Sequence, residues 1–139
     1  MSLLLDTNVV SELRKGAQAA VHVRTWFAGV DDGEIYLSVL VIGELRRGIE
    51  RIRGRDAAQA QALERWLTRL TRQHADRFLP VDRRVADQWG RFSSARSASP
   101  VDTLMAATAH IHDLTLVTRN VRDVVWTGVA CLNPFERQA

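Results

Sequence analysis

The fold is decided near the start of the chain, by Leu3-Leu4-Leu5-Asp6-Thr7-Asn8-Val9-Val10. Three consecutive leucines, with no polar residue between them, are typical of a strand that is buried on both faces, as in a parallel sheet. Thr7 and Asn8 can then start a helix that continues through Leu13. The stretch therefore predicts a buried strand that leads directly into a helix, as at the opening of an α/β unit.

The rest of the chain repeats this alternation. Further strands are expected at residues 35–37, 78–79, 114–118 and 129–132, with helices at 19–28, 39–51, 56–74, from Asp82 to Phe92, and 102–112. Residues 93–100 are expected to be a loop or a frayed helix end. The alternation predicts an α/β fold with a largely parallel sheet. Ligands of such sheets bind beyond the carboxyl ends of the strands, which singles out Asp6 and the segment after Thr118.

Length and composition limit the possible classes of protein. A chain of 139 residues with 46 % apolar residues suits one domain, expected to span residues 1–139. No targeting segment and no long apolar run is visible, so we expect a cytoplasmic protein that does not enter a membrane. The single cysteine, Cys131, excludes an internal disulfide and offers no Cys/His cluster for zinc.

The basic residues are almost all arginines. Lys15 is the only lysine among the 19 basic residues, and the net charge of +3 is too small to indicate nucleic-acid binding by itself. Their distribution is more informative, because five arginines fall within ten positions: Arg46, Arg47, Arg51, Arg53 and Arg55. They are either a solvated helix end or a rim that contacts phosphates.

Four acidic residues stand at unusual places in this pattern. Asp6 directly follows the buried first strand, and Glu44 lies on or beside the apolar face of its helix. Asp102 opens a helix whose small residues would let it pack closely on the sheet, and Asp123 lies just beyond a strand and a turn. Each has an ordinary interpretation when considered alone: a helix cap for Asp6 and Asp102, an arginine ion pair for Glu44, and a solvated loop acid for Asp123.

The four acids together indicate a metal site more strongly than any one of them. Hard cations such as Mg²⁺ and Mn²⁺ prefer carboxylate oxygens and water. Carboxylates that gather in one place repel one another unless a cation or a shared proton is present. Hydrolases with metal ions use such clusters to activate water and to stabilise the leaving oxygen. The residues alone therefore favour a metal-dependent hydrolase.

Other kinds of site fit less well. A haloacid-type phosphatase needs a second aspartate two residues after the first, where this chain has Asn8, and a response-regulator receiver needs an acidic pair and a lysine that are missing. His110 and His112 point to different faces of a helix, so a metal pair is not indicated. The tryptophans are expected to be core or interface anchors, with only Trp126, near Asp123, left open as a base-stacking residue.

Five short segments resemble the VapC-type PIN-domain toxins, and within that group the FitB-like branch. They follow one another in the family's order and cover nearly the whole chain: LLLDTNVVSE (3–12), SV (38–39) with GELRRG (43–48), DTLMAATA (102–109), LTLVTRNVRD (114–123), and GV (128–129) with NPF (133–135). Two departures are visible. Val124 stands where an aromatic residue is common, and residues 97–101 lack the usual glycine.

The resemblance implies a PIN-like three-layer α/β/α fold with a four- to five-stranded, mainly parallel sheet. It implies Mg²⁺ or Mn²⁺ held by four catalytic acids, Asp6, Glu44, Asp102 and Asp123, with a supporting shell of Thr7, Asn8, Thr118 and Asn120. Arg46, Arg47 and Arg119 are the candidates for binding RNA.

By the same resemblance, the protein is the toxin of a toxin–antitoxin pair and a metal-dependent endoribonuclease that hydrolyses RNA phosphodiesters. Its expected partners are a VapB-like antitoxin, a second toxin copy in a homodimer, and promoter DNA only through the antitoxin complex. The alternative is a catalytically weak PIN-fold interaction module that acts through an antitoxin and nucleic-acid complex.

Overall fold

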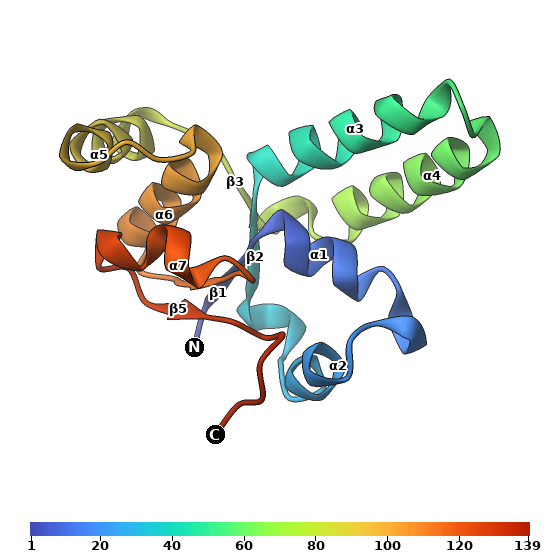
Figure 1. Cartoon of the computed structure of the whole chain (residues 1–139), viewed down its shortest axis with the longest axis horizontal. Helices are drawn as coiled ribbons and strands as arrows, with labels where there is room; N and C mark the ends of the chain where they lie inside the picture. Colours follow the sequence, from blue (N-terminus) through green and yellow to red (C-terminus); the bar gives the residue numbers. More distant parts are fainter.

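The computed structural model describes residues 1–139 (Figure 1). The five strands are β1 (Leu3–Leu5), β2 (Ile35–Ser38), β3 (Phe78–Leu79), β4 (Thr115–Val117) and β5 (Cys131–Leu132). The helices are α1 (Thr7–Leu13), α2 (Val21–Phe27), α3 (Val39–Arg53), α4 (Ala57–Gln73), α5 (Arg83–Ala95), α6 (Pro100–His112) and α7 (Val121–Val124). Four short 3-10 turns join them: η1 (Gly16–Gln18), η2 (Asp32–Glu34), η3 (Ala75–Arg77) and η4 (Val125–Thr127).

All strands run parallel in one sheet of order β3-β2-β1-β4-β5. Helices α1 to α4 lie on one side of this sheet and α5 to α7 on the other (Figure 1). Such covering of both faces is what an all-parallel sheet requires, since its strands are buried on each side. The predicted three-layer α/β/α fold with up to five strands is confirmed.

The strand order reverses direction at the centre of the sheet. The chain passes outward from β1 to β2 and β3, then returns to place β4 on the other side of β1. In register, Leu5 pairs with Val117, so β1 and β4 end side by side. A reversal of this kind opens a crevice beyond the carboxyl ends of the two strands, and ligands of open α/β sheets bind there.

The core supports that edge from both sides. Leu3, Leu4 and Leu5 are at most 2 % exposed, as the unbroken leucine run predicted. On the α6 side, Ala106 and Ala109 belong to the same core cluster and are almost fully buried. These small side chains allow a close approach between helix and sheet, which brings the start of α6 near the strand ends.

Several element boundaries differ from those predicted. The last strand is only Cys131–Leu132, and α5 continues to Ala95, which leaves a shorter connection before α6. Helix α6 begins at Pro100 with Ser99 as its N-cap, so Asp102 lies inside its first turn. Proline at the first helical position needs no hydrogen-bond partner, and this explains the earlier start. None of the helices is long and apolar enough to cross a membrane.

Candidate active site

Asp6 anchors the site at the end of β1. Its backbone N–H donates to the carbonyl of Val117 (2.9 Å), which continues the β1–β4 ladder by one residue. Its side chain caps α1 by accepting from the backbone N–H of Thr7 (2.8 Å). The capping interpretation of this residue is therefore correct, but it accounts for only one of the two carboxylate oxygens.

The second oxygen of Asp6 is held by side chains from two strand ends. Thr118, which is 1 % exposed, donates its hydroxyl to Oδ2 of Asp6 (2.7 Å), and the amide of Asn8 lies 3.5 Å from the same oxygen. Thr118 Oγ1 also accepts from the backbone N–H of Asn120 (3.0 Å), and Asn8 Oδ1 accepts from that of Arg119 (3.2 Å). These bonds orient one buried carboxylate and tie the turn after β4 to the start of α1.

Burial has an electrostatic cost for Asp6, whose side chain is only 7 % exposed overall. Desolvation raises the pKa of Asp6, the hydrogen bonds from Thr118 and Thr7 lower it in part, and the charge of Glu44 raises it again. The net pKa lies above the ordinary value of an aspartate. The fold thus holds a carboxylate in a place where its negative charge is destabilised.

Glu44 reaches the same edge from α3. Its Oε1 accepts a hydrogen bond from the Thr7 hydroxyl (2.5 Å), which joins α3 to the start of α1. Its Oε2 lies 3.7 Å from the guanidinium of Arg47, one turn further along α3. The arginine ion pair considered for this glutamate therefore exists, at the long end of the distance range and with the Arg47 side chain 60 % exposed.

Asp102 and Asp123 complete the acidic set from α6 and α7. Burial raises the pKa of the half-buried Asp102, and so do the negative charges of three carboxylates, in order of size those of Asp6, Asp123 and Glu44. The three other predicted acids are therefore all close enough to Asp102 to act on its charge. Asp123 lies in a short helix rather than in a loop, and it is exposed.

The four acids do not converge as metal ligands in this structure. As the side chains stand, no three histidine, cysteine, aspartate or glutamate residues converge into a group that could hold a metal ion. Carboxylates repel one another and spread apart unless a cation or a shared proton holds them together. The assignment of these residues as metal ligands, and of their neighbours as a supporting shell, stays a prediction.

Two hollows meet at Asp123 and flank the acids. The larger, of about 850 Å³, lies against the C-terminal segment and is lined by three arginines, Arg119, Arg122 and Arg137. The smaller, of about 300 Å³, is lined by Asp102, Arg96 and Trp126. Sequence reasoning named only Arg119 and kept Trp126 open. It missed the other arginines, although Arg122 directly precedes Asp123 and was visible for that reason.

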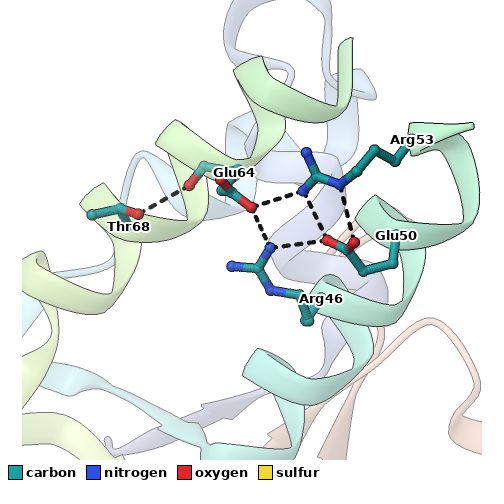
Figure 2. Close-up of polar contacts among 5 residues, drawn as sticks. All are labelled: Arg46, Glu50, Arg53, Glu64 and Thr68. Carbon is teal, nitrogen blue, oxygen red and sulfur yellow. Dashed lines mark hydrogen bonds and ion pairs between the residues drawn. The ribbon is translucent and has the colours of Figure 1, made fainter. Parts of the chain in front are cut away.

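The arginine cluster of α3 has a different setting, shown in Figure 2. Arg46 pairs with Glu50 (3.2 Å) and with Glu64 of α4 (2.5 Å), while Arg53 pairs with the same two glutamates at 2.8 Å each. Both positive charges are already compensated, and the four side chains join α3 to α4. The prediction that Arg46 and Arg47 bind RNA is not tested by this arrangement, which shows that both are engaged with acids.

Comparison with known proteins agrees with this architecture. The family model described as PIN domain matches residues 3–122. Toxin FitB of Neisseria gonorrhoeae is 31 % identical over 96 % of this chain and 98 % of its own, and VapC ribonuclease Y4jK of Sinorhizobium fredii is 31 % identical over the same shares. The solved structure of FitAB bound to an IR36 DNA fragment covers 99 % of this chain and 98 % of the matched chain, with a TM-score of 0.87 and 26 % identity.

The matched region contains three of the four acids and the whole β1–β4 crevice, and Asp123 follows it directly. The relatives extend over nearly the full chain, so the likeness is not confined to one motif. The chain belongs to the PIN-domain family.

Proposed function

We propose that this chain is the toxin of a toxin–antitoxin pair and a metal-dependent endoribonuclease. The observation that carries the proposal is the gathering of Asp6, Glu44, Asp102 and Asp123 within one electrostatic field at the topological switch point of the sheet. A relative named VapC ribonuclease and another named toxin FitB support the activity and the biological role. Residues 1–139 would act as one PIN domain.

The donor set suits Mg²⁺ or Mn²⁺. Four carboxylates without a sulfur or imidazole donor match the preference of these hard cations for oxygen. The charges of the other three acids raise the pKa of Asp102, so a positive ion among them would relieve a repulsion that the fold otherwise has to sustain. This is the physical reason to expect a divalent cation at this edge of the sheet.

A bound cation would supply charge stabilisation at the phosphate and a lowered pKa of the attacking water. In hydrolysis, the water oxygen bonds to phosphorus while the bond from phosphorus to the leaving ribose oxygen breaks. The protein's part is preorganisation: Thr118 and Asn8 orient the carboxylate of Asp6, and Thr7 orients that of Glu44. Groups held in this way need little reorganisation during the reaction.

Assembly with other macromolecules is part of the proposal. The likeness to a FitAB complex solved with a DNA fragment supports a VapB-like antitoxin as partner, with promoter DNA bound through the antitoxin complex. A homodimer of the toxin is expected on the same basis. The arginine-rich hollow beside Asp123, with Arg119 in its wall, is suited to RNA phosphates because a guanidinium pairs with phosphate through two parallel hydrogen bonds.

One observation favours the alternative of a catalytically weak interaction module. The acids do not converge into a group that could hold a metal ion as they stand. A protein with this site could still bind its antitoxin and nucleic acid through the same fold. Metal binding separates the two proposals, since only the nuclease requires it.

The decisive experiment is cleavage of total cellular RNA by the purified, antitoxin-free protein. Reactions with Mg²⁺, with Mn²⁺ and with EDTA are compared with the Asp6→Asn variant, which keeps a good helix cap. We expect discrete fragments that require the metal and are absent with the variant. No cleavage by a folded wild-type protein that also binds no Mn²⁺ would favour the interaction module.

A further inference from the structure

Arg96 is brought to the rim of the acidic site by the connection between α5 and α6. It directly follows α5 and has an extended backbone (φ −162°, ψ 138°), which turns the chain toward Ser99 and the start of α6. Its side chain is exposed and lines the 300 Å³ hollow together with Asp102 and Asp123. A long cationic side chain therefore stands beside the two acids that approach from α6 and α7.

Trp126 forms another wall of this hollow and is held in place by two contacts. Its indole Nε1 donates to the backbone carbonyl of Asp123 (2.8 Å), so the ring is tied to the helix that carries this acid. The ring also packs edge-on against Phe92 of α5, with centroids 6.1 Å apart. The tryptophan is thus oriented by the acidic site on one side and by α5 on the other.

The guanidinium of Arg96 lies over the face of this ring in a cation–π contact. Its Cζ is 5.5 Å from the centroid of Trp126. None of the ion pairs in the structure involves Arg96, although two carboxylates line the same hollow. A cation–π contact supplies no hydrogen-bond acceptor, so it leaves the N–H donors of the guanidinium available to an anion. Arg96 is therefore positioned without being neutralised.

We propose that Arg96, positioned by Trp126, binds a phosphate of the RNA strand next to the phosphate that is hydrolysed. The inference rests on the proposed ribonuclease function and adds a substrate contact on the α5–α6 side of the site. Trp126 acts as a positioning residue through Arg96. The ordinary alternative is that the stack only fastens the α5–α6 connection, in which case loss of Arg96 would leave RNA binding unchanged.

The test compares Arg96→Ala with Arg91→Ala. Arg91 lies in α5, five residues before Arg96, is exposed and pairs with Asp87 (3.1 Å). Its removal therefore changes the net charge equally without touching the hollow. Both are made in the Asp6→Asn background, and binding of a short fluorescein-labelled single-stranded RNA is followed by anisotropy over a series of KCl concentrations. Circular dichroism and thermal unfolding verify that each variant is folded.

We expect Arg96→Ala to weaken binding several-fold and to reduce the slope of log affinity against log salt by about 0.7, the value for one phosphate contact to a single strand. Arg91→Ala should match its parent. Trp126→Leu should weaken binding in the same direction, and the double variant with Arg96→Ala should bind no more weakly than Arg96→Ala alone. Trp126→Phe, which keeps an aromatic face, should lose less and covers the case that the leucine variant is unstable.

The outcomes separate this inference from the proposed function. In the catalytically intact chain, Arg96→Ala should raise KM more than it lowers kcat. If it cleaves and binds RNA as Arg91→Ala does, Arg96 is not a substrate contact, while the ribonuclease proposal stands. If binding depends on Arg96 but no variant cleaves RNA, the contact stands and the catalytic proposal fails. A wild-type protein that binds no RNA would overturn both.

Discussion

The acidic site and the arginine–glutamate cluster that joins α3 to α4 are two groups of charges with opposite designs. In the α3–α4 cluster, Arg46 and Arg53 alternate with Glu50 and Glu64, and each charge faces its opposite (Figure 2). At the strand ends, the charges of three acids act on Asp102, and among the four acids only Glu44 has a basic partner, at 3.7 Å. The charges of the α3–α4 cluster compensate one another, whereas the acidic site carries excess negative charge.

The pKa directions record the same contrast. The guanidinium groups of Arg53 and Arg46 lower the pKa of Glu50 to about 2, while burial and like charges raise those of Asp6 and Asp102. Exposed ion pairs contribute little and are screened by salt. Charges held against their own preference occur chiefly where a ligand or a reaction needs them. The comparison therefore separates charges that compensate one another from acids whose negative charge is destabilised.

The strongest test of this difference removes one acid from each group of charges. Asp102→Asn should reduce metal-dependent RNA cleavage by about 10²-fold or more, the scale of losing one electrostatic element of an active site. Glu64→Gln, on the side of α4 that faces α3, should leave the cleavage rate nearly unchanged. Initial rates at saturating Mg²⁺ measure both. Equal losses from the two variants would show that the acidic cluster has no special role.

A second test removes one hydroxyl from the acidic site and one from α4, next to the arginine–glutamate cluster. Thr118→Val should destabilise the fold by about 1–3 kcal/mol, because Oδ2 of the buried Asp6 carboxylate loses the hydroxyl that donates to it. Thr68, shown in Figure 2, donates only to the backbone carbonyl of Glu64 on an exposed helix face. Urea unfolding should therefore find Thr68→Val close to the wild type. Indistinguishable midpoints for the two variants would mean that Thr118 does not support Asp6.

Adding a divalent cation should affect only the acidic site. A ligand that binds the folded state alone stabilises it by about 1.4 kcal/mol at ten times its dissociation constant. We therefore expect Mn²⁺ to raise the melting temperature of the wild type and of Glu64→Gln, but not that of Asp102→Asn. Mg²⁺ serves as the second ion, and EDTA reverses the effect. A melting temperature that Mn²⁺ leaves unchanged in all three proteins would contradict the metal site.

The smallest expected effect concerns pH. Because the folded pKa of Glu50 is lowered from 4.5 to about 2, its contribution to stability is complete above pH 4.5 and is lost as the pH falls toward 2. The difference in melting temperature between wild type and Glu50→Gln should shrink over that interval and with added salt. For the acidic site without a bound metal the pH dependence has the opposite sign. The pKa values of Asp6 and Asp102 are raised in the folded state, so the free energy of unfolding falls as these groups ionise with rising pH. A melting-temperature difference that stays constant from about pH 6 to about pH 2 would contradict the pairing of Glu50 with the two arginines.

The parts of this molecule that could be predicted from its sequence are those governed by local pattern. Three leucines in a row identify β1, so Asp6 could be placed at a strand end. The apolar spacing around Glu44 placed that acid on or beside the apolar face of its helix. The parallel topology then follows from the alternation of strands and helices. These features depend on short-range periodicity and burial, which a sequence expresses directly.

The parts that could not be predicted depend on how two helices or loops approach each other. Arg46 and Arg53 gain a second acidic partner only because α4 places Glu64 beside them, eleven residues or more away in the sequence. Similarly, Arg96 meets Trp126 only because the α5–α6 connection turns back toward α7. Charge density along the chain drew attention to Arg46 and Arg47, which pair with glutamates. The hollow at Asp123 is lined by Arg119, Arg122 and Arg137, which form no ion pair.

The central position of β1 also determines when the site can exist during synthesis. Asp6 is made well before the hydroxyl that orients it, which belongs to Thr118, 112 residues later in the sequence. Until β4 has been made and paired with β1, the carboxyl end of β1 lacks one neighbour, and Asp102 and Asp123 are not yet beside it. Domains fold as units as they emerge, N-terminal parts first. A nascent chain of this kind therefore lacks its full acidic site until Asp123 has emerged and β4 has paired with β1.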